Sequence, residues 1–487
     1  MPTAHQEAGE AQVVVVGAGF SGIGAAIQLR QAGFRDLVVL EKAGELGGTW
    51  RDNTYPGCAC DVPSALYCYS FTGNPGGRRV FAGQREICDY LRATACRYGV
   101  DEVLRCGVEV RRAVWDASAG RWLLETTDGA CTARALVLAT GPWHCPRWPE
   151  IPGLGSFPGP VLHTSRWNES VELSGRRVAV VGSGASAIQL VPAIEARAAA
   201  VHLFQRTPQW VLPKPDVAIP PAVNWCLSRV PGLHRAVRAG QYGMQEAFVY
   251  AFRHPPLARL LQSAARAQLR LAVRDRELRR VLTPHYTMGC KRLLSSSTYF
   301  PALAKPHVHL HPTAVVAVEG NEVVGADGTR EASDAIIMAT GFHIGELPLA
   351  GRVHGGDGRT LADAWRGGRE AYLGTMVSGF PNLFLLLGPN LLSGATSAVT
   401  VLEAQLTYVC GALHHLRREG AASLDVAPSV QASYNSAVQK ALRTTVYNAG
   451  GCASYYFGPG GRNDFCWPWS TGRLVRLLSR FDPAACT

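Results

Sequence analysis

The chain has 487 residues, 47% of them hydrophobic, and a formal net charge of +11. This length suggests about three domains of ordinary size, and the composition is that of a soluble globular protein. No nucleic-acid-binding motif accompanies the basic charge. Anionic cofactors are a sufficient explanation for that charge, so we expect no nucleic-acid partner.

The cysteines and the apolar segments indicate in which cellular compartment the protein is expected. Fourteen cysteines are scattered along the chain without CxxC pairs or a secretory leader, so we expect reduced, mostly buried thiols in a cytoplasmic protein. Cys58, Cys60 and Cys68 form the closest group. They lack nearby histidines and zinc-like spacing, so we expect small core residues and no metal site. No apolar run approaches the length of a membrane span.

The first elements along the chain predict a dinucleotide-binding unit. The apolar run 13–16 predicts a buried strand, and residues 23–29 predict a helix. Between them lies a G-x-G-x-x-G loop formed by Gly17, Gly19 and Gly22. Such a loop lets the backbone approach a pyrophosphate, which the helix N-terminus stabilises. The next strand, 37–40, ends at Glu41, whose carboxylate can accept hydrogen bonds from a ribose diol. The unit therefore suits FAD or NAD.

A second loop of the same kind follows the predicted strand 178–181. Its small residues are Gly182, Gly184 and Ala187. The strand after it, 201–204, runs into Arg206 and Thr207 instead of an acid. Because a guanidinium pairs with a 2′-phosphate that a carboxylate would repel, this second unit suits NADPH.

The two loops predict an α/β fold with two Rossmann-like dinucleotide-binding domains, one for FAD and one for NADPH. Residues 137–141 and 337–341 are near copies, and each predicts a strand that ends in a small-residue turn. We interpret them as returns from an inserted domain to the sheet edge. The expected FAD domain is therefore discontinuous, residues 1–148 and 372–487, with an NADPH domain at 149–371 inserted between its parts.

Within the insertion, strand character gives way to helical spacing of apolar residues. This pattern predicts a helical cap at about residues 216–285. From Arg253 to Arg280 the segment holds eight arginines against Asp275 and Glu277. Such a bias is typical of a solvated helix face. A docking surface for an acidic partner, such as a carrier protein, is the alternative.

Two longer patterns indicate a family. One is F-x-G-x-x-x-H-x-x-x-W, formed by Phe157, Gly159, His163 and Trp167. The other is G-G-x-W-x-x-x-x-Y-P-G-x-x-x-D, formed by Gly47, Gly48, Trp50, Tyr55, Pro56, Gly57 and Asp61. Through both, essentially the whole chain resembles the type I Baeyer–Villiger monooxygenases, within the wider group of two-dinucleotide flavoprotein monooxygenases. Asn168 departs from the family pattern, which usually has Pro or Asp at that position.

The resemblance implies an enzyme that uses NADPH and dioxygen to insert an oxygen atom beside a ketone carbonyl through a flavin peroxide, giving an ester or lactone. It assigns catalysis to Arg292, which would stabilise the peroxide, and to Asp61, which would hold Arg292 in place. Lys291 would reach the 2′-phosphate of NADPH together with Arg206. His163 and Trp167 would couple the two domains.

The resemblance also implies further cofactor contacts. Gly48, Thr49, Trp50 and Asp61 are expected near the flavin, and so are Gly388 and Asn390 in a loop that follows a return strand. Residues 393–397 would open a helix whose N-terminus faces the flavin ring. The aromatic segment 467–469 fits either a substrate-pocket wall or packing of the tail.

Three alternative functions differ from this one in the residues that they require. A flavin-dependent S- or N-oxygenase needs a protonated hydroperoxide, against which Arg292 and Asp61 argue. A disulfide reductase needs two redox cysteines about five positions apart, and Cys58 and Cys60 are spaced wrongly. A non-catalytic nucleotide-binding redox sensor would not need Asp61 and Arg292. The identity of the ketone and the oligomeric state are left open.

Overall fold

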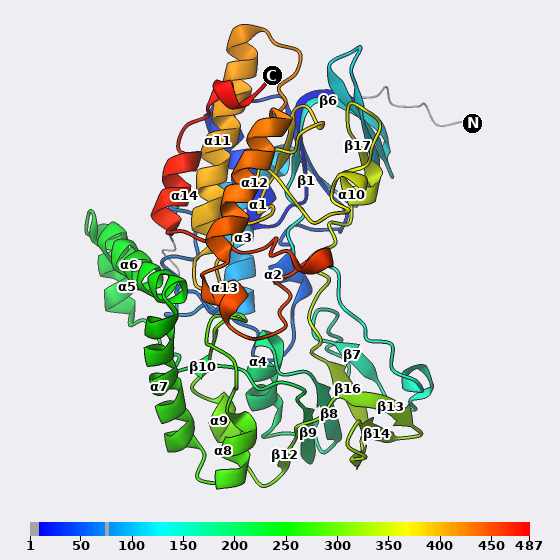
Figure 1. The fold of residues 1–487 in the computed structure, drawn as a ribbon, viewed down its shortest axis with the longest axis vertical. Helices are drawn as coiled ribbons and strands as arrows, with labels where there is room; N and C mark the ends of the chain where they lie inside the picture. The colour runs from blue at the N-terminus through cyan, green and yellow to red at the C-terminus, as the bar shows by residue number, and fades with distance from the viewer. Residues whose placement is uncertain (1–8, 74–76) are drawn as a thin grey trace.

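Two sheets organise the chain into two lobes that are stacked along the long axis of the molecule (Figure 1). The computed structural model describes residues 9–73 and 77–487. Helices in the middle of the chain lie along one side of both lobes, and the second half of the chain returns to the first lobe.

The first lobe contains an eight-stranded sheet in the order β17-β4-β5-β6-β1-β2-β3, with β18 paired to β6. Its strands are β1 (Gly9–Val16), β2 (Leu37–Glu41), β3 (Leu104–Cys106), β4 (Val110–Asp116), β5 (Arg121–Thr126), β6 (Gly129–Leu138), β17 (Val353–His354) and β18 (Leu383–Leu385). The central strand β1 pairs in parallel with β2 and β6. Its valines are buried on both faces, as a continuous apolar run in a parallel sheet requires.

Helices cover one face of this sheet. They are α1 (Phe20–Gln31), α2 (Thr49–Asp52), α3 (Gln84–Arg97), α11 (Ala398–Glu419), α12 (Pro428–Leu442), α13 (Val446–Ala449) and α14 (Thr471–Leu478), whereas α10 (Leu361–Ala364) packs on the opposite face. Val13 and Val15 pack in one core with α1 and α11, whereas Val14 and Val16 pack in another with residues 349–380. The alternation follows from the two-residue period of a strand.

The second lobe contains a five-stranded parallel sheet in the order β12-β9-β8-β16-β7. Its strands are β7 (Val161–His163), β8 (Arg177–Val181), β9 (Ala200–Phe204), β12 (Val308–His311) and β16 (Ala335–Met338). One face packs on α4 (Ala185–Ile194) and α9 (Tyr299–Leu303). The other face packs on an antiparallel sheet of β13 (Val315–Glu319), β14 (Glu322–Gly325) and β15 (Arg330–Ala332).

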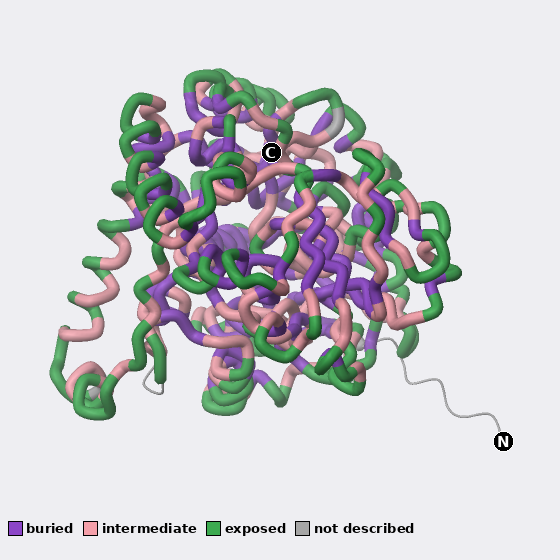
Figure 2. The backbone as a smooth tube through the Cα atoms, turned by 90° about the horizontal axis from the view of Figure 1, so that it is seen from below, coloured by how far each residue is buried: buried purple, intermediate pink, exposed green. Residues whose placement is uncertain are grey.

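Four helices occupy the range expected for a cap: α5 (Pro221–Arg229), α6 (Leu233–Arg253), α7 (Pro255–Ala272) and α8 (Arg276–Leu282). At their base, β10 (Val211–Leu212) pairs with β11 (Leu294–Ser295). In Figure 2 the cap projects from the body as a largely exposed lobe. Arg238 of α6 forms an ion pair of 3.3 Å with Glu403 of α11, so the cap is also attached to the first lobe. Most of the cap arginines from Arg253 to Arg280 are exposed, which fits a solvated face.

Short 3₁₀ helices complete the regular structure, at Val100–Glu102, Leu154–Ser156, Ala350–Arg352, Pro459–Gly461 and Pro483–Ala485. In the part of the chain that the structure describes, no helix is both long and apolar enough to cross a membrane.

The expected inner boundary at residue 371 is wrong. Strand β17 pairs with β4 of the first sheet, and residues 349–371 pack in the core of the first lobe, so the chain has returned well before residue 371. No local pattern marks this return, because β17 has only two residues.

The two near-copy segments are not returns to a sheet edge either. Strand β6 lies between β5 and β1, and β16 lies between β8 and β7. Each segment instead closes over the first glycine of its own nucleotide loop. A Cβ added at Gly17 would lie 2.7 Å from the carbonyl oxygen of Ala139, and one at Gly182 would lie 2.5 Å from that of Ala339.

The cysteines differ from the expectation at one pair. Cys290 and Cys452, 162 positions apart, form a disulfide. The other twelve cysteines are free, but more of them are half-buried than fully buried. Cys58 and Cys60 are among these free thiols, and burial raises the pKa of each above its usual range. They therefore show neither the bond nor the activated thiolate of a redox pair.

Candidate active site

A cavity lies at the carboxyl ends of β1 and β2, where ligands bind to open parallel sheets. We call it the first-lobe cavity. Its walls come from residues 16–21, 40–42, 47–52 and 139–144, together with the first turn of α11. The N-terminus of α1 opens onto it, and no side chain caps that helix end, so its N–H groups are free to bind an anion.

The first glycine loop has the geometry that a nucleotide loop needs. Gly17 has a φ of +106°, which favours glycine, and it makes the tight turn after β1. A Cβ at Gly22 would overlap the carbonyl oxygen of Gly17, so only glycine lets α1 pack this close to the strand. Gly19 lines the cavity and faces Gly48 across it: a Cβ at Gly48 would lie 3.0 Å from the Cα of Gly19.

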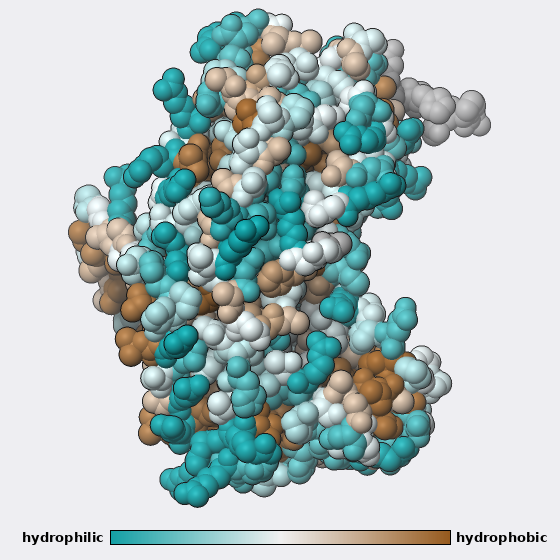
Figure 3. Space-filling model, in the orientation of Figure 1, coloured by the Kyte–Doolittle hydropathy of each residue, from teal (hydrophilic) through white to brown (hydrophobic). Residues whose placement is uncertain are grey.

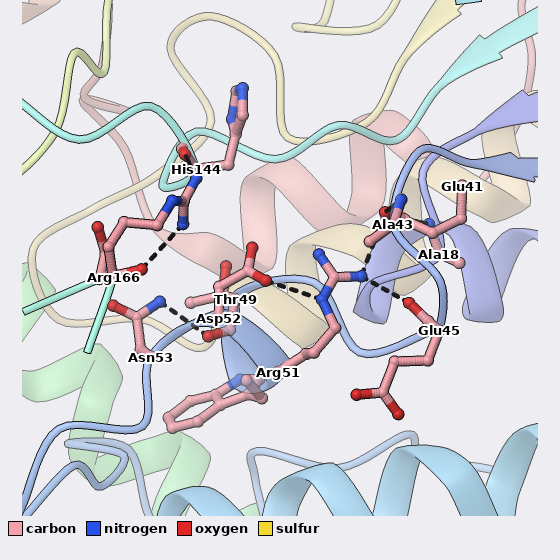
Figure 4. A network of polar contacts seen from close by, with 12 residues as sticks. Ala18, Glu41, Ala43, Glu45, Thr49, Arg51, Asp52, Asn53, His144 and Arg166 are labelled. Carbon is pink, nitrogen blue, oxygen red and sulfur yellow. Dashed lines mark hydrogen bonds and ion pairs between the residues drawn. The ribbon is translucent and has the colours of Figure 1, made fainter. Parts of the chain in front are cut away.

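Glu41 ends β2 and lines the same cavity. Its carboxylate accepts hydrogen bonds from the backbone N–H groups of Ala18 at 2.8 Å and Ala43 at 3.0 Å. Arg51 adds an ion pair of 3.2 Å to Glu41 and one of 2.7 Å to Asp52. In Figure 4 the guanidinium of Arg51 lies between these acids and the backbone of Glu45. These bonds fix the Glu41 carboxylate at the edge of the cavity.

The short helix α2 supplies another wall. Thr49 and Trp50 line the cavity, and the Trp50 indole donates a hydrogen bond of 3.1 Å to the hydroxyl of Tyr67. Trp50 is buried and packs in the core as well, so it both shapes the cavity and holds the loop.

The second glycine loop has the same construction. Gly182 has a φ of +111°, and Ala187, in the place of the third glycine, is completely buried. Gly184 has open space around its Cα on the side where a side chain would be, which leaves room for a ligand. It precedes α4, whose N-terminus has no side-chain cap.

Two cations stand beside this second loop. Burial and then the charge of Arg206 lower the pKa of Lys291, so the two side chains are close to each other. Among the described residues, neither forms an ion pair with a carboxylate. The backbone of the neighbouring Thr207 is held by a hydrogen bond of 3.0 Å from the hydroxyl of Ser183. Two close, unneutralised cations form a site for a dianion.

Arg292 and Asp61 form a fork-like ion pair. The guanidinium nitrogens donate to the two carboxylate oxygens at 2.9 to 3.1 Å. The charge of Asp61 raises the pKa of Arg292 further above its already high value, so the side chain is always cationic. The guanidinium lies over the ring of Trp143, 5.7 Å from its centre, and Trp143 lines the first-lobe cavity. Neither Asp61 nor Arg292 lines the cavity itself, and Trp143 is the lining residue that Arg292 contacts.

The segment from Tyr55 to Asp61 also docks the first lobe onto the second. The hydroxyl of Tyr55 donates to the side-chain oxygen of Gln189 in α4 at 2.7 Å. The Gln189 amide in turn donates to the carbonyl of Ala59 at 2.9 Å. Gly57 lies so close that a Cβ there would be 2.5 Å from the Gln189 carbonyl oxygen. One segment thus connects the first-lobe cavity, the second glycine helix and Arg292.

His163 is completely buried where the chain crosses between the lobes. Its ring contacts Trp148 at 5.2 Å and Phe342 at 6.2 Å between ring centres, one from each crossing segment. Its Nδ1 accepts the backbone N–H of Ser165 at 3.1 Å. Burial is the main reason that its pKa falls to about 4, so the imidazole is neutral near pH 7. Trp167 is half-buried and packs on the core of the second lobe.

Comparison with known proteins identifies the family. Residues 11–227 match the family model described as pyridine nucleotide-disulphide oxidoreductase. A Baeyer–Villiger monooxygenase of Streptomyces coelicolor is 45% identical over 99% of this chain and 93% of its own. One of Pseudomonas aeruginosa is 43% identical over 97% of this chain and 90% of its own. The chain belongs to the Baeyer–Villiger monooxygenase family.

A solved structure agrees with this assignment. A steroid monooxygenase in its oxidised form, bound to NADP, is 28% identical, covers 97% of both chains and superposes with a TM-score of 0.84. This monooxygenase therefore shares its two-lobe fold with a solved structure and its family with close sequence relatives.

Four expected flavin-site residues of the monooxygenase do not line the first-lobe cavity: Gly22, Asp61, Gly388 and Asn390. Asn390 is buried, and its amide donates to the carbonyls of Asn463 and Cys466, so it anchors the C-terminal loop. Gly388 packs tightly against the carbonyl of Gly374. The positions of Gly388 and Asn390 after β18 suggested the cavity, but the wall there is made by Leu387 and α11.

Three site residues of the monooxygenase were missed by sequence reasoning: Arg51, Trp143 and Gln189. Arg51 directly follows Trp50 of the G-G-x-W pattern, and this position in the sequence could have identified it. Trp143 follows the turn at residues 139–141, which was interpreted as a return strand. Gln189 lies on the second glycine helix and has no local pattern that marks it.

Proposed function

We propose that this family member is an NADPH- and dioxygen-dependent monooxygenase that converts a ketone to an ester or lactone. One oxygen atom enters beside the carbonyl carbon and the other leaves as water, and NADPH supplies the two electrons. The observation that carries the proposal is the Arg292–Asp61 pair, which places a permanent cation against the wall of the first-lobe cavity.

FAD fits the first-lobe cavity, where it would supply two-electron chemistry with nicotinamide and dioxygen. The first glycine loop and the free N-terminus of α1 would bind its pyrophosphate. Glu41 would accept hydrogen bonds from the adenosine ribose, and α2, with Thr49 and Trp50, would close over the nucleotide.

NADPH fits the second glycine loop. Gly182 makes the tight turn and Gly184 leaves space for its pyrophosphate, and Arg206 and Lys291 would bind the 2′-phosphate. Since these two cations repel one another, a dianion between them is stabilised by both, whereas an unphosphorylated ribose would leave them unneutralised. This difference favours NADPH over NADH.

Arg292 would stabilise negative charge that develops on the carbonyl oxygen of the ketone as that carbonyl is attacked. The pair with Asp61 supports this role in two ways. It keeps the guanidinium in one orientation, and it lets Arg292 remain charged in a partly buried place. An S- or N-oxygenase would not need a fixed cation there, because a heteroatom substrate develops no oxyanion of this kind.

His163 and Trp167 would couple the lobes, as the resemblance implied. The contacts of His163 with both crossing segments support this role for His163. A neutral imidazole of low pKa does not change charge near pH 7, so we assign it positioning and not proton transfer.

The test is product analysis with isotopically labelled dioxygen and NADPH on cyclic, linear, aromatic and polycyclic ketones, with sulfides in parallel. The proposal expects purified protein that is yellow, bleaches with NADPH and gives an ester or lactone with one labelled oxygen atom. Sulfoxide as the sole product would support the S-oxygenase instead. A colourless protein that does not oxidise NADPH would instead support a non-catalytic nucleotide-binding redox sensor.

We also propose that the monooxygenase works in the cytoplasm. Twelve free cysteines support a reducing compartment. Fractionation of the producing cells would test this, and recovery of the protein outside the cytoplasmic fraction would contradict it.

A further inference from the structure

A cluster of nitrogen and oxygen donors lies in the second lobe, away from the residues assigned to the cofactors. His202 is on β9, His311 is the last residue of β12, and Glu331 is on β15. The parallel register of β9 and β12 pairs His202 with His309 and Phe204 with His311. His202 and His311 therefore point to the same face of the sheet, which the antiparallel strands β13 to β15 cover (Figure 1).

Two imidazole nitrogens and the two oxygens of the Glu331 carboxylate lie close together, and one ligand atom from each of the three residues lies within 4.8 Å of the other two. His202 Nδ1 is 3.3 Å from Glu331 Oε2 and 3.4 Å from His311 Nε2, and His311 Nε2 is 3.5 Å from Glu331 Oε1. With metal–ligand distances of about 2.0–2.1 Å, the ligand atoms of a tetrahedral zinc site are about 3.3–3.4 Å apart. The separation of the two imidazole nitrogens, 3.4 Å, is that of two ligands in such a site, and each nitrogen faces a different oxygen of Glu331.

We propose that His202, His311 and Glu331 bind a divalent transition metal ion of the zinc type. Two imidazoles and one carboxylate are a donor set that Zn²⁺ takes readily, with water in the fourth position. No local spacing in the sequence marks the site, because His202 and His311 are 109 positions apart and the third ligand is on another sheet.

The surroundings suit neutral imidazoles and a cation. Burial is the largest influence on both histidines, and it lowers the pKa of His202 and of His311. Since a metal ion binds the neutral imidazole, a lowered pKa reduces competition from protons. The positive charge of Arg177 also lowers the pKa of His202, but this guanidinium is paired with Asp334 at 2.7 and 3.1 Å.

The site would act on the fold and not on the reaction. Its ligands come from two strands of the five-stranded sheet and one of the antiparallel sheet, so a bound ion would join the two layers. Arg206 lies two residues after the end of β9, the strand that carries His202. A bound ion would thus hold the end of β9 that presents Arg206.

Without metal, the ordinary explanation of the cluster is a proton shared between the histidines and Glu331. The two explanations differ in a measurable way. The flavin-loaded protein, stripped with a chelator, is dialysed against Zn²⁺, and the bound zinc is measured by elemental analysis together with the thermal midpoint. The variants are Glu331→Gln and His311→Gln, which each remove one ligand at nearly constant size.

His307→Gln is the matched control, because His307 also faces a glutamate, Glu195 at 3.1 Å, but has no third donor. We expect one zinc ion per chain and a higher thermal midpoint in the wild type and in this control, with at least about tenfold weaker binding in both ligand variants. A wild type that binds no zinc, or all four proteins binding it equally, would overturn the proposal. Either result would be independent of the oxygenation test, because the readouts are metal content and unfolding.

Discussion

Arg292 shows how one side chain can be both fixed and charged. Its Nε and Nη2 atoms donate to both oxygens of Asp61, so the guanidinium has one orientation and keeps its proton. Lysine cannot reproduce this arrangement, because a flexible ammonium has no planar fork. The same residue contacts Trp143, which connects it to the cavity wall.

Replacing Arg292 separates its role from cofactor binding. In Arg292→Ala and Arg292→Lys, we expect NADPH to reduce the flavin at close to the wild-type rate, while ester formation falls by a factor on the order of 100 or more, as for loss of an oxyanion donor. Anaerobic bleaching measures the first step and labelled product the second. An ester yield equal to that of the wild type in either variant would show that Arg292 is not a catalytic residue.

Asp425 provides a pH-dependent prediction at a site remote from catalysis. Burial raises its pKa to about 6, although Gly379 N–H donates to it at 2.9 Å. Because the folded state binds the proton more tightly than the unfolded state, stability falls as pH rises from about 4 through 6. Asp425→Asn should lack this loss and be more stable than the wild type above pH 6, by on the order of 2 kcal/mol. Denaturant unfolding of both proteins at acidic and neutral pH measures this. The same difference in unfolding free energy between variant and wild type at the two pH values would contradict the prediction.

At the scale of elements, the two nucleotide loops are built alike. In each, the first glycine turns under the carbonyl of an alanine, Ala139 or Ala339, that follows a neighbouring strand. The near copies at 137–141 and 337–341 therefore reflect the same contact made twice, once in each lobe.

The close packing at Gly22 predicts a specific loss of flavin. A Cβ there overlaps the Gly17 carbonyl, so Gly22→Ala must move either α1 or the loop. We expect FAD content to fall to a small fraction of one per chain, measured as the ratio of flavin to protein absorbance. Gly44→Ala is the control, since nothing lies within 4 Å of its added Cβ. Full flavin content in Gly22→Ala would show that the loop adapts.

Sequence reasoning succeeded where the signal is local and failed where it is not. Both glycine loops, the strands before them and the cap range follow from short-range periodicity, and the Arg292–Asp61 contact followed from family resemblance. The boundary at residue 371 failed because β17 is only two residues long and its place is set by pairing with β4. The Cys290–Cys452 bond spans 162 positions, and no spacing pattern encodes such a contact.

At the scale of the molecule, the two lobes meet where their chemistry must be coordinated. Residues 55–61 leave the first-lobe cavity, dock on α4 and end at the partner of Arg292. The helical cap contacts both lobes, and Figure 3 shows a hollow between the lobes on the face opposite the cap. A hydride donor in one lobe and a flavin in the other need a defined arrangement across this junction.

Gln189 is the residue that tests this junction. Its amide accepts from Tyr55 and donates to Ala59, so Gln189→Ala breaks the bridge and leaves the Tyr55 hydroxyl without this acceptor. Each lobe keeps its own glycine loop, so the affinities for FAD and NADP⁺ should stay close to those of the wild type. The arrangement between lobes should loosen, and we expect a several-fold fall in ester formed per NADPH consumed, since a lost buried hydrogen bond costs about 1–3 kcal/mol.

The matched control is Gln431→Ala, which removes a glutamine that accepts the Ser378 N–H at 2.8 Å within the first lobe. That change should reduce stability without altering the ratio of ester to NADPH. If Gln189→Ala left the ratio unchanged while Gln431→Ala behaved in the same way, the contact would be structural only. A lower ratio of ester to NADPH in Gln189→Ala alone, at unchanged cofactor affinity, would show that residues 55–61 couple the lobes. These residues are the part of the first lobe that contacts both Gln189 and Arg292.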